Sequence, residues 1–135
     1  MKYAYYILSI LFASIMTSCS STPTDKLKNT VEKMESIKIN EITERNWEEF
    51  EASIQEIQAD IEINKEKMTP EEIKEWHYWY GRYYALGIKR AFYPVSFLGE
   101  NILKFAEGFM QGFGVNTSEM EDGLKDGLNL FDNRK

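Results

Sequence analysis

The side chains best suited to chemistry in this sequence lie in one short stretch, Glu75–Tyr84, which reads EWHYWYGRYY. It holds His77, the only histidine of the chain, with two tryptophans and four tyrosines. A single histidine cannot form a zinc site by itself, and neither an HExxH nor a CxxC motif is present. Aromatic rings beside a cation can instead bind a sugar or a cationic group by stacking. The stretch is therefore either a ligand surface or the inside of a helix bundle.

The helical period favours the second interpretation. At 100° per residue, most of the aromatic residues fall on one broad arc, as core residues do. Tyr78 and Arg82 lie together on the opposite, polar face, where we expect a solvated pair or, alternatively, a small exposed stacking surface. His77 lies at the edge of the arc and is expected to be a hydrogen-bonded boundary residue. The arc comprises Ile73, Trp76, Trp79, Tyr80, Tyr83, Tyr84, Gly87 and Ala91, and its last two residues are expected to let another helix come close.

The surrounding segments also have the spacing of amphipathic helices. Thr43 is placed to cap a helix whose apolar residues recur at steps of three and four, namely Trp47, Phe50, Ile54, Ile57 and Ile61. Thr69-Pro70 marks the start of the aromatic helix, because threonine caps and proline fits the first helical position. The sequence predicts an all-α fold, a single helical bundle of four main helices at about 25–39, 43–67, 70–92 and 96–113, with a short C-terminal helix at about 118–131. The acidic helix 43–67 is expected to lie outermost.

Glycines spaced four apart mark the C-terminal region. Each helical glycine costs about 1 kcal/mol relative to alanine, so their spacing indicates either a close helix contact or a segment that becomes ordered on a partner. Helix 96–113 is apolar enough to be the central helix, whereas helix 118–131 has the weakest claim to a fixed place. We expect the partner to bind in this region, and His77, Tyr78 and Arg82 are further candidates. The expected contacts are Gly108, Gly112, Gly123, Leu124, Gly127, Leu128 and Phe131.

The first eighteen residues have the pattern of a signal peptide. Lys2 precedes an apolar run that is too short to span a membrane. Met16-Thr17-Ser18-Cys19 follows and resembles the lipobox of bacterial lipoproteins, with Met16 in place of the usual leucine. The resemblance implies cleavage after residue 18 and lipidation of Cys19. The alternative is an ordinary secretory signal with a chance cysteine.

The lipobox also predicts a location and a domain organisation. The residue after the cysteine is Ser20 and not an aspartate, which resembles the sorting signal of outer-membrane lipoproteins. This signal leaves open whether the protein faces the periplasm or the cell surface. Residues 19–24 are expected to be the lipidated cysteine and a polar tether, and residues 25–135 one helical domain. In size, lipobox and helical content the chain is similar to small helical lipoproteins of Bacteroidota, a resemblance that carries no functional motif.

Charge and motif content narrow the functional class. The chain has a net charge of −6, which becomes −7 without Lys2. An acidic domain argues against nucleic acid as a partner and against docking on anionic lipid. We recognise no nucleophile motif, phosphate-binding loop or metal-ligand spacing, so we expect neither an enzyme nor a cofactor or metal.

Three functions remain. The leading one is a non-enzymatic adaptor or structural protein that is held at the membrane by its lipid and binds an envelope protein. The second is a carrier for a small apolar ligand or lipid between the aromatic third helix and the apolar fourth, where His77, Tyr80 and Tyr84 would supply polar groups. The third is an immunity lipoprotein that binds a toxin.

Overall fold

The computed structural model describes residues 21–93, the helical positions Lys104 and Gly108, and residues 117–132. Within these residues every regular element is helical, which confirms the all-α prediction at that level. The α-helices are α2 (Pro23–Glu35), α3 (Glu44–Asn64), α4 (Pro70–Phe92) and α6 (Ser118–Asp132), and the 3-10 turns are η1 (Ile39–Glu41) and η2 (Lys65–Lys67). The predicted helix 96–113 lies outside the described residues apart from its two isolated positions.

Three helices begin in the same way. In each, a threonine side chain accepts a hydrogen bond from the backbone N–H three residues later, and the side chain of that later residue accepts one from the threonine N–H. Such capping boxes satisfy donors that have no partner inside the helix. The pairs are Thr22 with Asp25 in α2, Thr43 with Asn46 in α3, and Thr69 with Glu72 in α4.

Helices α3 and α4 match their predicted bounds closely, but α2 does not. It begins at Pro23, two residues earlier than expected, because Thr22-Pro23 forms the same cap and first turn as Thr69-Pro70. Thr24 is therefore a buried helical residue and not part of a tether. The helix also ends four residues early, at Glu35, and η1 then leads the chain into α3.

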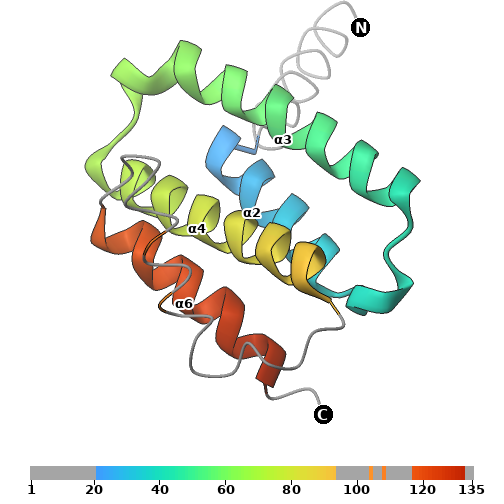
Figure 1. Ribbon diagram of the computed structural model, residues 1–135. Helices are drawn as coiled ribbons and strands as arrows, with labels where there is room; N and C mark the ends of the chain where they lie inside the picture. The colour runs from blue at the N-terminus through green and yellow to red at the C-terminus, as the bar shows by residue number, and fades with distance from the viewer. Residues whose placement is uncertain (1–20, 94–103, 105–107, 109–116, 133–135) are drawn as a thin grey trace, which may run out of the picture.

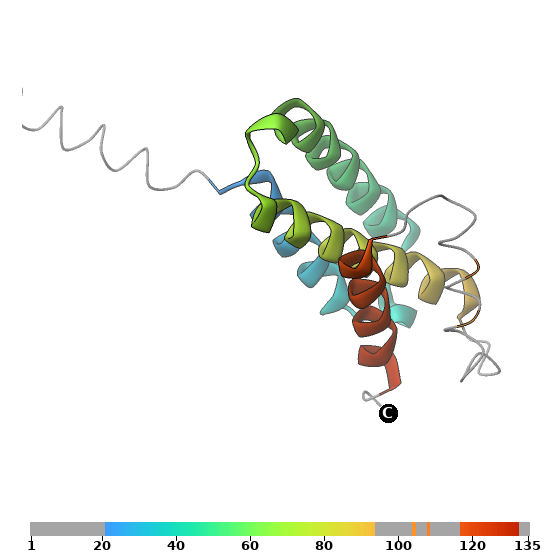
Figure 2. The ribbon, with the colours of Figure 1, turned by 90° about the vertical axis from the view of Figure 1, so that its left-hand side faces the viewer.

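The helices form layers with α3 on one side, α2 and α4 in the middle, and α6 on the far side of α4 (Figure 1). The perpendicular view again shows α3 apart on one side of α2 and α4, with α6 crossing α4 (Figure 2). Helix α3 runs opposite to α2 and α4: Lys26 near the start of α2 pairs with Asp60 near the end of α3, at 3.5 Å. Arg90 near the end of α4 pairs with Glu44 at the start of α3.

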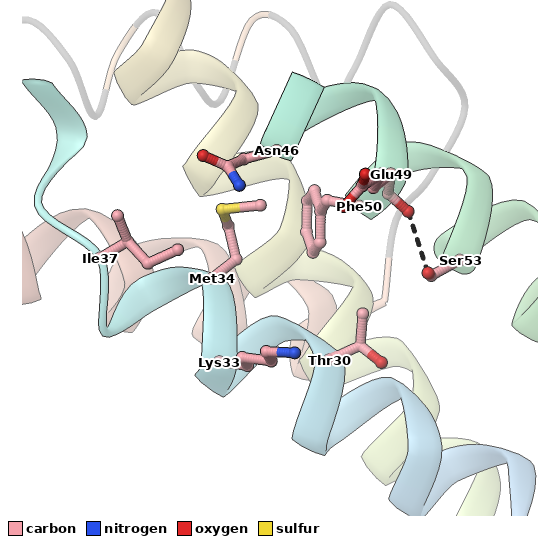
Figure 3. A pocket seen from close by; sticks show the side chains of 8 residues that line it. All are labelled: Thr30, Lys33, Met34, Ile37, Asn46, Glu49, Phe50 and Ser53. Carbon is pink, nitrogen blue, oxygen red and sulfur yellow. Dashed lines mark hydrogen bonds between the residues drawn. The ribbon is translucent and has the colours of Figure 1, made fainter. Parts of the chain in front are cut away.

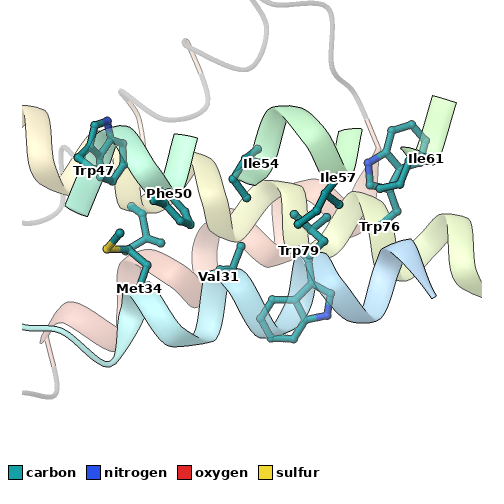
Figure 4. Close-up of a cluster of buried hydrophobic side chains, with 11 residues drawn as sticks. Val31, Met34, Trp47, Phe50, Ile54, Ile57, Ile61, Trp76 and Trp79 are labelled. Carbon is teal, nitrogen blue, oxygen red and sulfur yellow. The ribbon is translucent and has the colours of Figure 1, made fainter. Parts of the chain in front are cut away.

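Side chains of α2, α3 and α4 fill the main core (Figure 4). All five apolar residues predicted for α3 are buried in it, and they meet Leu27, Val31 and Met34 of α2. Trp76 and Trp79 of α4 are each only 9% exposed. The aromatic arc of α4 is thus mainly a packing surface, as its period predicts.

A second, smaller cluster joins α4 to α6. Ala85 and Ile88 of α4 pack there against Met120, Leu124 and Leu128, all of which are buried. Helix α6 is therefore docked on α4, contrary to the expectation that it has a weak claim to a fixed place, and the backbones of these two helices approach each other more closely than those of any other pair of described helices.

Candidate functional site

Three half-buried tyrosines of the stretch EWHYWYGRYY contact one another, namely Tyr80, Tyr83 and Tyr84. The ring of Tyr80 lies 5.5 Å from that of Tyr83 and 5.2 Å, edge to face, from that of Tyr84. The Tyr80 hydroxyl donates to the Gln58 side-chain oxygen of α3 at 2.9 Å. Burial, reinforced by Tyr84, raises the pKa of Tyr80 well above its usual value, and the bond to Gln58 opposes that rise only in part. These rings pack against the two core clusters and stabilise the position of α4.

Arg82 is not the solvated residue that its place on the polar face predicts. Its Nε and Nη2 donate to the two carboxylate oxygens of Glu35 at 2.8 and 2.6 Å. The two side chains are only 12% and 10% exposed. The guanidinium also lies 5.0 Å from the Trp79 ring. A bidentate pair with this little exposure fixes the end of α2 against the middle of α4.

Tyr78 extends this contact to α6. Its hydroxyl donates to Asp126 at 2.7 Å and accepts a hydrogen bond from Arg82 Nη1 at 3.2 Å. Burial first, and the bond to Asp126 second, raise the pKa of Tyr78. The prediction of a solvated or exposed Tyr78–Arg82 pair is therefore wrong, because the polar face of α4 is covered by α2 and α6. The pair positions three helices relative to one another.

His77 is a boundary residue, as expected, and its hydrogen bond stays a prediction. It is half-buried, and its ring lies 4.8 Å from that of Trp76 and is tilted by 42° to it. Burial lowers the pKa of His77, Glu119 opposes the shift, and Lys65 adds to it. Over the described ranges no group of three His, Cys, Asp or Glu side chains is arranged to hold a metal ion.

Close backbone approach between α4 and α6 depends on three glycines. A Cβ added at Gly123 would lie 1.9 Å from the Tyr78 carbonyl oxygen, and one at Gly81 would lie 2.1 Å from the Met120 carbonyl oxygen. At Gly127 it would lie 2.5 Å from the Cβ of Ala85. Because these contacts advance in the same direction along both helices, α4 and α6 run parallel. We call this contact the glycine seam.

The small residues predicted to admit a neighbouring helix on α4 have no close neighbour among the described residues. A Cβ at Gly87 would meet no described atom within 4 Å, and Ala91 is exposed. The close approach occurs at Gly81 and Ala85, on the side of α4 that holds Tyr78 and Arg82. Gly81 and Ala85 are four residues apart, as are Gly123 and Gly127. This shared spacing is the sequence signal that could have identified the contact between the two helices.

The structure also places the predicted contacts of the C-terminal region. Gly123, Leu124, Gly127 and Leu128 are buried against α4, so in this conformation the chain covers them itself. Gly108 is helical and exposed. Contact between any of them and a partner stays a prediction. Cys19, Gly112 and the Phe131 side chain lie outside the description.

A cleft of about 240 Å³ lies between the second half of α2 and the first half of α3 (Figure 3). Met34 and Phe50 supply its apolar base and belong to the core, while Ile37 borders it where the chain leaves α2. Its polar members are Thr30, Lys33, Asn46, Glu49 and Ser53. The cleft therefore combines an apolar base with a cation, a carboxylate, an amide and two hydroxyls. No spacing in the sequence marks it, because its residues come from the polar–apolar boundaries of two helices.

A wider hollow borders the glycine seam and is less specific. It measures about 720 Å³ and lies over Tyr78 and Trp79. Its rim carries charges of both signs in close alternation, from Lys28, Lys74, Glu75, Glu119, Asp122, Lys125 and Asp126. Such a mixture selects no single class of ligand, so the cleft between α2 and α3 is the better candidate.

Comparison of the chain with protein families, curated proteins and solved structures gives no match. Within the described residues, no helix has both the length and the apolarity needed to cross a membrane.

Proposed function

We propose that this protein is a lipid-anchored cell-envelope protein of the non-enzymatic, adaptor type, which binds a protein partner near the membrane. The lipobox-like Met16-Thr17-Ser18-Cys19 supports the anchor, and Ser20 favours the outer membrane. The packing of the described helices supports an adaptor. The stretch Glu75–Tyr84, whose side chains are the best candidates for binding a ligand, is occupied by contacts within the chain.

The cleft between α2 and α3 is the observation that carries the partner-binding part of the proposal. Hot spots in protein interfaces are typically single anchor side chains that fill a small pocket with an apolar base. Pockets for drug-sized ligands usually measure about 300–1,000 Å³, so a cleft of about 240 Å³ suits one side chain better than a lipid chain. Lys33 and Glu49 at its edge would orient polar groups of the partner.

Site-specific photo-crosslinking in the native host tests this proposal. A photoreactive amino acid at Ile37 or Ser53 should give one discrete protein adduct. The matched control is Gln55, which is exposed on the same helix as Ser53 but does not line the cleft. Adding Ser53→Trp, which fills the cleft from an exposed position, should abolish the adduct formed at Ile37. An equal pattern from Gln55, or an adduct that survives Ser53→Trp, contradicts binding in the cleft.

Intact-mass measurement of the detergent-extracted protein tests the anchor separately. The expected mature chain begins at an acylated Cys19 and lacks residues 1–18, and Cys19→Ser should abolish the acylation. A gently purified protein that retains bound lipid in stoichiometric amount, beyond the covalent acyl chains, would favour the carrier function instead.

A further inference from the structure

One end of the bundle gathers the first turn of α2, the last turn of α3, the turn η2 and the start of α4 (Figure 2). The ion pair between Lys26 and Asp60 fixes the start of α2 to this end of α3. The cleft lies toward the other end of α2, since its α2 residues begin at Thr30. We call the end that gathers the start of α2, the end of α3, η2 and the start of α4 the η2 end.

The chain between the lipidation site and the fold is short. Because Thr22 is already the cap of α2, only Ser20 and Ser21 separate it from Cys19. Three fully extended residue steps span about 10–11 Å. Helix α3, with 21 residues, is about 32 Å long. A lipid attached at Cys19 therefore keeps the η2 end within about a third of the bundle length from the bilayer.

The η2 end also carries an exposed apolar side chain. Ile63 is 78% exposed, and the other large apolar side chain found exposed in the described part, Tyr93, follows the opposite end of α4. At the η2 end, the exposed acidic residues Glu62, Glu66 and Glu71 outnumber Lys65 and Lys67, while Lys26 is paired with Asp60. This combination suits a zwitterionic lipid surface and disfavours an anionic one.

We propose that the η2 end rests on a zwitterionic lipid surface, with Ile63 in the headgroup region and the cleft between α2 and α3 in the half of the bundle that is farther from the membrane. This orientation rests on the proposed lipid anchor at Cys19. It places the anchor and the partner site in opposite halves of the bundle, so that the partner is held off the bilayer by about half the length of the bundle or more.

Fluorescence depth measurement on the full acylated protein tests the orientation. Because Cys19 is the only cysteine and its thiol would be acylated, an introduced cysteine is the only free thiol. An environment-sensitive dye is attached at Ile63→Cys, Gln55→Cys or Glu48→Cys, three exposed positions on α3. The second and third lie about 12 and 22 Å from the first along the helix. The proteins are reconstituted in phosphatidylcholine vesicles that contain a headgroup-labelled quencher lipid.

The proposal predicts a gradient, with strongest lipid quenching at position 63, weaker quenching at 55 and least at 48. Iodide in the aqueous phase should show the reverse order, with loss of most of its quenching at 63. Equal quenching at the three positions, or a reversed gradient, in protein that floats with the vesicles overturns the orientation but leaves the anchor intact. Failure to float with the vesicles overturns the anchor itself, and the orientation with it.

Discussion

Among the described residues, helix α4 has neighbours on two sides, and the two sides hold it in different ways. On one side, α2 and α3 meet it through large side chains, such as Ile61, Trp76 and Trp79, which fill the space between separated backbones. On the other side, α6 meets it through Gly81, Gly123 and Gly127, where backbone touches backbone. The first interface should therefore be weakened by removing atoms, and the glycine seam by adding them.

The largest effect on the free energy of unfolding is expected from Glu35→Ala, which breaks the ion pair between α2 and Arg82 of α4. It leaves the Arg82 guanidinium without its bidentate carboxylate in a largely buried position. Removing one partner of a buried pair costs about 3–5 kcal/mol. Urea denaturation should show this loss, whereas Glu32→Ala, an exposed change on the same helix, should have little effect. An equal response to both substitutions would mean that the ion pair contributes little.

The next effect tests the side-chain-filled interface. Ile61→Ala removes atoms from a fully buried site, which should lower the free energy of unfolding by about 2–5 kcal/mol. Ile63→Ala makes the same chemical change two residues later on an exposed side chain, and should stay within about 0.5 kcal/mol of the wild type. The comparison fails if the two variants have the same denaturation midpoint.

The glycine seam should be destabilised by adding atoms, and the expected loss of stability is smaller than in the two predictions above. Gly123→Ala adds one methyl group that would lie 1.9 Å from the Tyr78 carbonyl oxygen, so the helices must separate. We expect a loss of about 1–3 kcal/mol. Gly87→Ala is the matched control: its methyl group meets no atom of the described residues within 4 Å, so higher helix propensity should stabilise the fold by up to about 1 kcal/mol. Thermal denaturation should move the two midpoints in opposite directions.

The smallest effect is a pH dependence at the edge of the core. Burial lowers the pKa of His77 below its ordinary value of 6.5, so the unfolded chain takes up the proton first as the pH falls. The stability linked to neutral His77 is present above pH 6.5 and is lost as the pH falls through the lowered pKa of the folded state. His77→Gln should remove this part of the slope of stability against pH. An unchanged slope would show that other groups produce it.

Local sequence signals predicted most of the core. The spacing from Trp47 to Ile61 identified every buried apolar residue of α3, and Thr69-Pro70 fixed the start of α4. The same cap and proline at Thr22-Pro23 were instead predicted to belong to a tether, because they follow closely after the lipobox-like Met16-Thr17-Ser18-Cys19.

Contacts between distant segments were harder to predict. Helical period assigned Tyr78 and Arg82 to a polar face, but it cannot show that α2 supplies Glu35 and α6 supplies Asp126 to cover that face. The cleft was missed for the same reason, since it exists only where α2 and α3 meet.

Hydrogen–deuterium exchange of the intact protein tests the central contrast most directly. In the wild type, the backbone amides of α6 should be protected, because the helix is held on α4. In Gly123→Ala, protection should fall selectively in the amides of α6. It should persist in the amides of α3 and in those of α4 that face the main core. In Gly87→Ala, the amides of α3, α4 and α6 should all stay protected. Equal protection of α6 in the wild type and in Gly123→Ala, or an unprotected α6 in the wild type, would contradict the glycine seam.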